Sequence, residues 1–172
     1  MEKDINLKIS LKLNNILKAL GFNTVMVRTT DTAVNTDGDT IRQKKVSDIK
    51  FRYSFMQEYP DSIYLCIHQN KYSSAGVNGT QIFYSPNDSN SKLLAEYLQE
   101  SIINGTKQNR TRPLKPCTDD VYLIHNATTS AVLIECGFLS NQNDLNKLKT
   151  DEYQQILSFS IASGLINMIN DS

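Results

Sequence analysis

The sequence has no long apolar run and no excess of charge of either sign. No apolar stretch approaches the roughly 20 residues that a membrane-spanning helix needs. Lysine and arginine total 18, and so do aspartate and glutamate, so the formal net charge is zero. A neutral chain lacks the overall electrostatic attraction on which binding to polyanions depends. We therefore expect neither a membrane span in this chain nor a nucleic-acid partner.

Cysteine is scarce as well. The three thiols lie at Cys66, Cys117 and Cys136, an odd number without CxxC spacing. This pattern argues against a disulfide framework and against a four-cysteine zinc site. Because Cys66 and Cys136 lie in apolar runs, and free cysteine is among the most buried residue types, we expect unreactive buried thiols.

The N-terminus does not have the pattern of a signal peptide. Its first ten residues, MEKDINLKIS, form a charged amphipathic segment. Either the protein stays inside the cell or its export segment is not part of this sequence. We find no internal repeat and no linker, and 172 residues fit one domain, 1–172, with a sizeable core.

The spacing of apolar residues predicts alternating strands and helices. In the first helix, Ile5, Ile9 and Leu13 fall on one stripe together with Ile16 and Leu20. The helices are expected at 3–20, with Gly21 as its C-terminal cap, at 48–59, with Ser47 as its N-cap, and at 89–103, 142–149 and 151–169. The strands are expected at 23–29, 62–68, 80–85, 120–126 and 131–136, and long loops at 30–46 and 104–118.

This order of elements predicts an α/β fold. Strands that alternate with helices favour a three-layer sandwich, with a mixed central sheet and helices on both faces. The strand 62–68 is apolar on both faces, so we expect it at the centre of the sheet.

The two histidines lie near the ends of expected strands. His68 ends the strand SIYLCIH, and ligands of open α/β sheets bind beyond the carboxyl ends of the strands. A histidine there is well placed to bind a metal or to transfer a proton, and the alternative is a hydrogen-bonded structural histidine. His125, in YLIHNA, could be a second metal ligand, contact a substrate or be structural.

Two glutamates lie in apolar surroundings. In AVLIECGF, Glu135 shares one strand face with Ala131 and Leu133. An unpaired carboxylate there loses hydration, which raises its pKa towards the range that a general base requires. Glu2 falls at the centre of the apolar stripe of the first helix, so we expect it to point towards the sheet. The alternatives are an ion-paired Glu135 and a Glu2 that only caps its helix or interacts with the helix dipole.

A histidine and two glutamates that meet at one sheet edge are typical of a zinc hydrolase. Zinc accepts nitrogen and oxygen ligands, keeps one position for water and lowers the pKa of that water to about 7. A nearby carboxylate then accepts a proton as the water attacks a carbonyl group. The residues themselves therefore suggest a metal-dependent hydrolase.

The chain resembles the zinc-dependent type 3 family of N-acetylmuramoyl-L-alanine amidases. The blocks IHxN and GFLSN are together highly specific, and IRQKKVSDIKFR (41–52) and NGTQIFYSPN (78–87) are most similar to the germination-specific, spore-cortex branch. The matching segments follow one another over essentially the whole chain: EKDINLKISLKL (2–13), VMVRT (25–29), SDIKFR (47–52), YLCIHQN (64–70), NGTQIFYS (78–85), SKLLAEYLQ (91–99) and AVLIECGFLSN (131–141).

The resemblance implies a reaction and the residues that perform it. The bond cleaved would be the amide that joins the lactyl group of N-acetylmuramic acid to L-alanine of the stem peptide. Glu2 and His68 would bind Zn²⁺ together with a second histidine, and Glu135 would be the catalytic base.

Four further residues match family-typical positions: Asn70, Asn141, Arg28 and Arg52. The resemblance implies that they orient the substrate or support the metal ligands. Ordinary hydrogen bonding at loops and strand ends is the alternative.

One part of the family pattern is not found in these residues. The first zinc histidine of the family lies in a Gly-rich HGG-type segment, after a first strand and before the helix that starts here at Glu2. We therefore expect domain 1–172 to be N-terminally incomplete and to offer two zinc ligands. The family does not use the position of His125 as a ligand.

The resemblance also implies partners and a location. The substrate would be peptidoglycan glycan strands that carry stem peptides, and an accessory protein of the spore envelope is a possible partner. The site of action would be extracytoplasmic, in the cell wall or spore cortex region. The alternative is a weak or inactive domain with the amidase fold that binds peptidoglycan or a partner protein.

Overall fold

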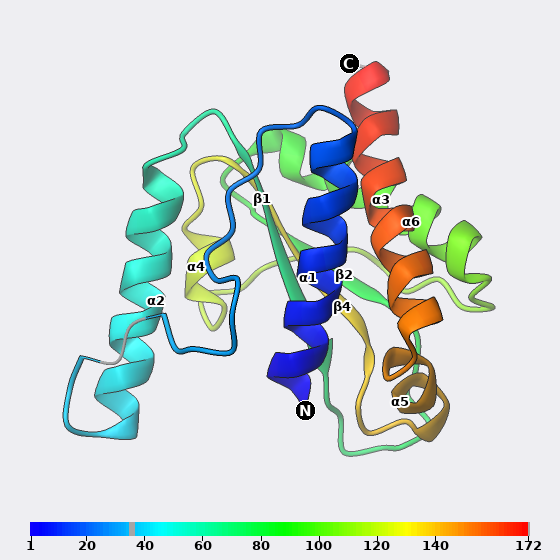
Figure 1. Ribbon diagram of the computed structural model, residues 1–172, viewed down its shortest axis with the longest axis horizontal. Coiled ribbons are helices and arrows are strands. Elements are labelled where there is room, and N and C mark those ends of the chain that lie inside the picture. The colour runs from blue at the N-terminus through cyan, green and yellow to red at the C-terminus, as the bar shows by residue number, and fades with distance from the viewer. Residues whose placement is uncertain (35–36, 172) are drawn as a thin grey trace.

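The computed structural model describes residues 1–34 and 37–171, and it places a mixed sheet between helices (Figure 1). Residues 35 and 36, within the expected loop 30–46, lie outside the described residues. The elements are α1 (Glu2–Ala19), α2 (Ile41–Gln57), β1 (Ile63–Asn70), β2 (Gln81–Tyr84), α3 (Ser89–Thr106), β3 (Lys115–Pro116), α4 (Tyr122–His125), β4 (Ser130–Phe138), α5 (Gln142–Leu148) and α6 (Asp151–Asn170).

The sheet has the strand order β1-β4-β2-β3. β4 lies parallel to β1 and antiparallel to β2, and the short β3 lies parallel to β2. The parallel pairing aligns Ile63 with Ser130 and continues to His68 beside Glu135. The carboxyl ends of β1 and β4 therefore meet at one edge of the sheet, where ligands bind in open α/β folds.

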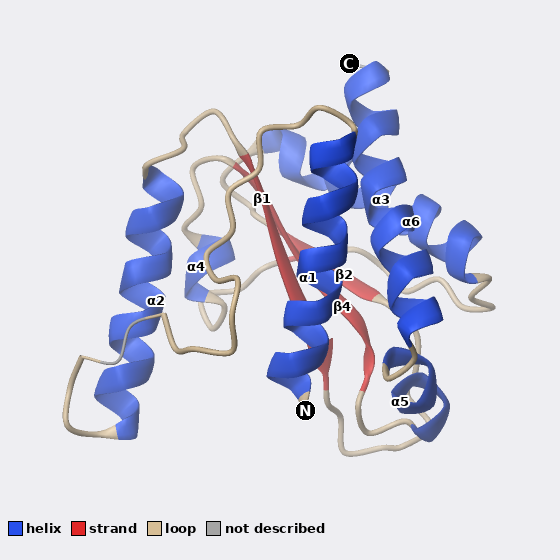
Figure 2. Cartoon of the chain, viewed as in Figure 1, coloured by secondary structure: helices blue, strands red, loops and turns tan. Residues whose placement is uncertain are grey.

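Helices cover both faces of the sheet. Figure 2 shows α1, α3 and α6 on one side and α2 and α4 on the other. Successive residues of β4 serve the two sides, because side chains alternate along a strand. Ile134 packs in the cluster that contains Ile9 of α1, whereas Leu133 packs with Met56 of α2 and Ile124 of α4. The predicted three-layer α/β sandwich with a mixed sheet is confirmed.

Helix α1 forms where the apolar stripe predicted it. Ile5, Ile9 and Leu13 are buried against the sheet and α6. Leu20, which the predicted stripe included, lies beyond the helix and is 52% exposed. Gly21 follows with φ = +88°, a left-handed conformation that glycine adopts without a steric penalty and that ends the helix.

Helix α2 begins earlier than the predicted range 48–59, and the prediction that Ser47 is its N-cap is wrong. The N-cap is Thr40, whose Oγ1 accepts a hydrogen bond from Gln43 N at 3.2 Å. Gln43 Oε1 accepts one in return from Thr40 N at 2.9 Å. This reciprocal pair is a capping box, and the exposed polar residues that follow it hide the helical period in the sequence.

The predicted strand over 120–126 is also wrong, because Tyr122–His125 form the one-turn helix α4. The backbone N–H of His125 donates to Val121 O at 2.9 Å, and that of Asn126 donates to Tyr122 O at 3.0 Å. The turn buries Ile124 completely. A run of four apolar residues is too short for its periodicity to distinguish a strand from a helical turn.

Two expectations about the sheet are not met. Residues 23–29 form no strand, and β1 lies at the edge of the four-stranded sheet instead of at its centre. The apolar side chains on both faces of β1 reflect helices on both faces of the sheet, α1 on one side and α2 on the other. They carry no information about whether a second strand pairs with each edge. Within the predicted loop 104–118, α3 extends to Thr106 and β3 pairs with β2.

None of the helices in residues 1–34 and 37–171 combines the length and the apolar character that crossing a membrane requires.

Candidate functional site

The N-terminus of α1 and the carboxyl end of β1 bring Glu2 and His68 into contact. Oε1 of Glu2 lies 3.1 Å from Nδ1 of His68, and it accepts a hydrogen bond from the backbone N of Gln69 at 3.4 Å. The side chains of His68 and Glu2 are 48% and 43% exposed, so solvent reaches both. Two residues that are 66 positions apart in the sequence thus present a nitrogen and an oxygen donor at one point of the sheet edge.

Glu135 lies beside this pair on the neighbouring strand. It is the register partner of His68 across β1 and β4. Burial and, to a smaller extent, the negative charge of Glu2 raise the pKa of Glu135 to about 7. Its Oε2 is buried and has no hydrogen-bond partner among the described residues. A carboxyl group with a pKa near neutrality both accepts and releases protons at physiological pH, as a general base must.

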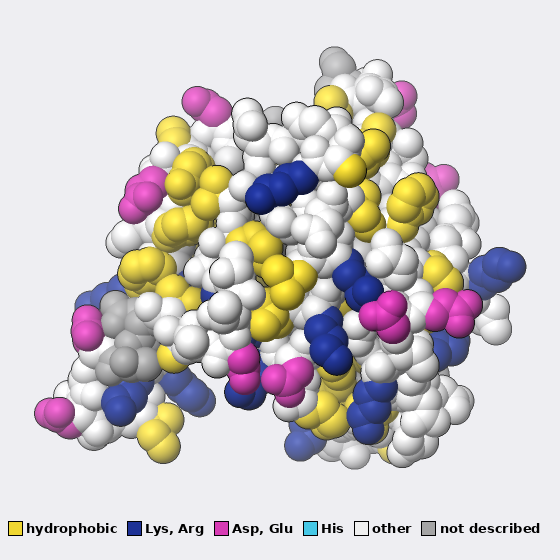
Figure 3. Space-filling model, in the orientation of Figure 1, with side chains coloured by type: hydrophobic (Ala, Val, Ile, Leu, Met, Phe, Trp, Pro, Cys, Tyr) yellow, Lys and Arg dark blue, Asp and Glu magenta, His cyan; other side chains and the backbone are white. Residues whose placement is uncertain are grey.

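A cavity of about 1520 Å³ opens beside these three side chains. Its walls come from α1, residues 22–28 and 31–33, α2, residues 58–62, β1, residues 120–124 and the C-terminal part of α6. Glu2, His68 and Glu135 all line it. Figure 3 shows hydrophobic side chains over α2 and in the hollow between α2 and α1, with charged side chains of both signs along the rim near the N-terminus of α1. The volume exceeds the roughly 300–1,000 Å³ of ordinary small-molecule pockets.

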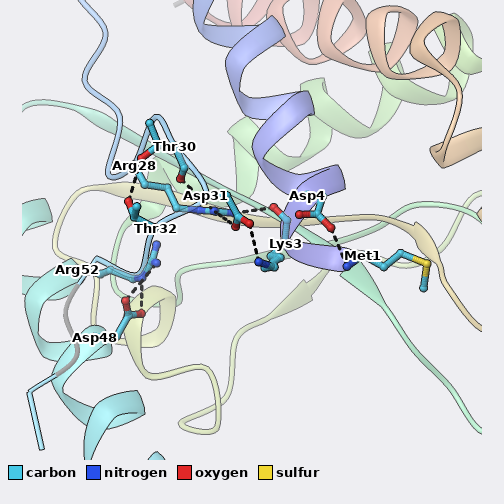
Figure 4. Close-up of polar contacts among 9 residues, drawn as sticks. All are labelled: Met1, Lys3, Asp4, Arg28, Thr30, Asp31, Thr32, Asp48 and Arg52. Atoms are coloured by element: carbon cyan, nitrogen blue, oxygen red, sulfur yellow. Dashed lines mark hydrogen bonds and ion pairs between the residues drawn. The ribbon is translucent and has the colours of Figure 1, made fainter.

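Arg28 connects residues on the rim of this cavity to the first turn of α1 (Figure 4). Its Nη2 donates to Lys3 O at 2.6 Å, and its Nη1 lies 3.4 Å from Thr30 O and 3.6 Å from Oδ1 of Asp31. Lys3 in turn forms an ion pair with Asp31 at 2.6 Å. These contacts hold the backbone next to Glu2, so Arg28 orients the start of α1.

Arg52 lines the cavity from α2. Figure 4 shows its ion pair with Asp48 of the same helix, with Nε 2.6 Å from Oδ2 and Nη2 3.3 Å from Oδ1. Tyr64 and Cys66 of β1 face it, and burial raises the pKa of Tyr64 beyond its usual range. The guanidinium is thus held between α2 and the sheet by partners within the protein.

Two asparagines support the loop that follows β1. Asn70 Oδ1 accepts a hydrogen bond from the next backbone N–H at 2.7 Å. Asn141 is the N-cap of α5, where its Oδ1 accepts from Asn143 N and Asp144 N at 3.1 Å each. Its Nδ2 donates to Ala75 O at 2.7 Å, which ties the loop to the end of β4. Both side chains thus make ordinary backbone contacts here, and a role in substrate orientation stays a prediction.

The structure does not bring His125 to the other candidate residues. His125 lies in α4, outside the cavity lining, with its Nδ1 3.0 Å from Cys117 O. Glu2, His68 and Glu135 therefore gather at the sheet edge without it.

The donors fit a zinc ion in kind but not in number. Zinc takes imidazole nitrogen and carboxylate oxygen ligands, and catalytic sites use three of them. Glu2 and His68 supply one oxygen and one nitrogen. Across residues 1–34 and 37–171, no group of three or more His, Cys, Asp and Glu side chains is arranged to hold a metal ion.

One residue that the sequence did not predict is Asp144, which joins the segment before β2 to the end of β4. Its Oδ2 accepts hydrogen bonds from Gly79 N and Phe138 N, both at 2.9 Å. Only its place in the first turn of a helix marks it in the sequence, because acidic residues are favoured there. Its two backbone partners come from segments that no sequence pattern links to it.

The family model described as "N-acetylmuramoyl-L-alanine amidase" matches residues 1–167. The chain belongs to this family. Among solved structures, this amidase-family chain is similar to the CwlD amidase of Clostridioides difficile in complex with the GerS lipoprotein, with a TM-score of 0.94 and 31% identity. The match covers 99% of this chain and 87% of that one. The chain is also similar to the catalytic domain of the amidase CwlV of Bacillus (Paenibacillus) polymyxa, with a TM-score of 0.80 and 26% identity over 100% and 87% of the two chains.

Relatives of known sequence agree with this assignment. The germination-specific N-acetylmuramoyl-L-alanine amidase of Bacillus subtilis is 28% identical over 99% of this amidase-family chain and 72% of its own length. The amidase LytC of the same organism is 28% identical over 97% of this chain and 31% of its own length. The predicted family, its hydrolase class and the likeness to a germination-specific member are confirmed.

Proposed function

We propose that this chain hydrolyses the amide bond between N-acetylmuramic acid and L-alanine in peptidoglycan, with Glu135 as the general base. One observation carries the proposal: a buried carboxyl group with a pKa of about 7 lies beside an exposed histidine–glutamate pair on the wall of a large cavity. Family membership supports the reaction class. The geometry supports Glu135 as the base and Glu2 and His68 as the metal ligands.

Glu135 moves the proton in this proposal. Its Oε2 has no partner among the described residues and is free to accept a proton from the attacking water. Protonated Glu135 then returns the proton to the departing nitrogen of L-alanine. A pKa near 7 suits both steps, because the group is a competent acceptor and a competent donor at the same pH.

Glu2 and His68 would hold Zn²⁺, together with a third donor from outside the described residues. When bound, such an ion supplies Lewis-acid chemistry: it polarises the scissile carbonyl and acidifies water. Gln69 supports the pair, because its backbone N–H fixes the Glu2 carboxylate on the side of His68. Arg28 fixes the first turn of α1 from the other side.

The substrate we propose is peptidoglycan of the spore cortex, and the site of action is extracytoplasmic. The similarity to a germination-specific amidase supports the first point. A structural neighbour was solved in complex with a lipoprotein, which supports an accessory protein of the spore envelope as a partner. Arg28 and Arg52, which line the cavity, and Asn70 and Asn141, which support the loop after β1, would position the glycan and stem peptide.

The test is the release of peptides that begin with L-alanine. Zinc-loaded protein is incubated with cortex muropeptides, and new N-terminal L-alanine is measured by mass spectrometry, with Glu135→Gln as the matched control. We expect release by the wild type and a loss of at least about a hundredfold in the variant, the usual size of a general-base contribution. A wild type that binds one equivalent of zinc and releases no peptide would exclude the proposal.

A second function is favoured by the number of metal donors. Because only two ligands gather among the described residues, the chain could bind peptidoglycan or a partner protein without hydrolysing it. Sedimentation with insoluble cortex separates the two functions. Equal retention of wild type and Glu135→Gln, with no peptide released by either, would favour the binding domain.

A further inference from the structure

The segment between α3 and β3 carries a local excess of positive charge in an otherwise neutral chain. Residues 107–115 include Lys107, Arg110, Arg112 and Lys115 and no acidic residue. None of these four forms an ion pair with a carboxylate in the part of the chain that the structure describes. Arg112 is half-buried and the other three are exposed.

Arg112 is held rigidly, yet most of its hydrogen-bonding capacity is unused. Its Nε donates to Asn78 O at 2.9 Å, and its guanidinium carbon lies 4.8 Å from the ring centroid of Phe138. Among the described residues, Nε is the only guanidinium nitrogen with a hydrogen-bond partner, and Nη2 is buried without one. A guanidinium presents five donors in a planar fork. Nη1, which in the described part of the chain is neither hydrogen-bonded nor among the buried unpaired atoms, is the nitrogen that an incoming anion can reach.

Arg110 adds a second positive charge to the same place. Burial and the neighbouring charge of Arg110 lower the pKa of Arg112, and Asp144 opposes them only partly. Two adjacent cations without a paired carboxylate repel each other. A bound anion would reduce this repulsion. The favourable electrostatic energy would add to that of hydrogen bonds to the unused donors.

This basic segment reaches the sheet edge that carries Glu135. β4 is flanked by β1 on one side, where His68 aligns with Glu135, and by β2 on the other, where Gln81 aligns with Glu135. Directly opposed residues place their side chains on the same face of the sheet. The Nε2 of Gln81 donates to Pro113 O at 2.7 Å, next to Arg112. The basic segment and the His68–Glu2 pair therefore lie on opposite sides of Glu135.

We propose that Arg110 and Arg112 bind a carboxylate of the peptide arm of the substrate while Glu135 acts on its amide bond. The inference depends on the proposed function, because the occupant is the peptide part of that substrate. Any such peptide carries at least a C-terminal carboxylate, which is ionised at neutral pH. Arginine forks bind carboxylates through paired charge-assisted hydrogen bonds, which gives orientation as well as affinity.

Binding to a matched pair of ligands tests the subsite without requiring turnover. One muropeptide carries free peptide carboxylates, and in the other they are amidated. Dissociation constants are measured by calorimetry for the Glu135→Gln protein, so that no cleavage interferes. We expect the free acid to bind about tenfold more tightly, the size of one charge-assisted pair, and this preference to shrink as salt is added.

Variants then locate the preference. Arg110→Gln should weaken binding of the free acid about tenfold and leave binding of the amidated ligand unchanged. Lys44→Gln, at an exposed position of α2, makes the same change of net charge and should alter neither constant. Arg112→Lys keeps the charge but not the fork, and it should lose part of the preference. Because Arg112 packs on Phe138, its replacement by lysine keeps a long side chain at this position and disturbs the fold less than a shorter residue would.

The outcomes separate this inference from the proposed function. Equal affinity for the two ligands, or an equal loss for both in Arg110→Gln, would overturn the subsite, even if the wild type releases L-alanyl peptides. Preserved carboxylate preference with no peptide release would overturn the hydrolase and leave the subsite standing. A protein that binds neither muropeptide overturns both.

Discussion

At the scale of single residues, Glu135 links stability to pH. Its pKa of about 7 lies above the ordinary value of 4.5, so the folded protein binds more protons than the unfolded chain between these values. Stability must therefore fall as the pH rises through this window, and the ionised group costs about 3 kcal/mol above it. In metal-free protein we expect Glu135→Gln to be more stable than the wild type by about this amount at pH 8 and similar to it at pH 4.

Chemical denaturation at a series of pH values measures this difference. A variant that is less stable than the wild type at pH 8 would mean that the Glu135 carboxylate has a stabilising partner, and the assignment as a base would lose its physical support.

His68 provides the second prediction at this scale. As one of the two donors at the sheet edge, His68→Ala should lower zinc affinity by more than about a hundredfold, because even a supporting residue of a metal ligand contributes about 10–100-fold. His125→Ala is the matched control, since His125 contacts Cys117 O and lies outside the cavity lining. Zinc per protein after dialysis, measured by atomic emission, distinguishes them. Equal zinc content in both variants would refute the ligand assignment.

The sequence identified functional residues only where a polar side chain stands among apolar neighbours. Glu135 and His68 are polar residues at the ends of apolar strands, and Glu2 lies on an apolar helical stripe, so each was noticeable without a structure. Asp144 and Arg112 were not, because their partners are backbone groups of distant segments. Backbone groups look the same in every sequence, so no pattern could have pointed to them.

At the scale of elements, Asn141 joins a helix cap to the loop after β1. Replacement by alanine removes the cap of α5 and the bond to Ala75 O. We expect Asn141→Ala to lower the free energy of unfolding by about 1–2 kcal/mol. We also expect faster amide hydrogen exchange in residues 71–79, whereas Asn143→Ala, at an exposed position of the same helix, should change neither. Unaltered exchange in the loop would show that other contacts suffice to hold it.

Element prediction was accurate for the long periodic elements and for the short helix α5, and it failed at the start of α2 and at the one-turn helix α4. α1 and α6 have apolar residues repeated over four or more turns, and β4 alternates between two buried clusters, so all three lie close to their predicted ranges. α4 is a single turn, and its apolar residues Tyr122, Leu123 and Ile124 fit a strand equally well. Residues 23–29 have the composition of a strand, but a strand requires a pairing partner, and a sequence does not state which partners its segments find.

At the scale of the whole molecule, the strand order predicts how the sheet exchanges its amide hydrogens. β4 has a hydrogen-bonded neighbour on both sides, whereas β1 has β4 on one side and the cavity on the other. Successive amides of a strand point to opposite edges, so every second amide of β1 should exchange quickly and those directed at β4 slowly. In β4 we expect slow exchange throughout the segment from Val132 to Glu135, which pairs on both sides.

Residue-resolved hydrogen exchange by nuclear magnetic resonance reads out this alternation. Protection of every amide along β1 would mean that another segment pairs with its free edge, and residues 23–28, which line the same cavity, would be the first candidates. The edge position of β1 affects the site, because His68 aligns with Glu135 on β4 and contacts Glu2 of α1. A second strand against β1 would shield His68 from solvent and change the number of donors within its reach.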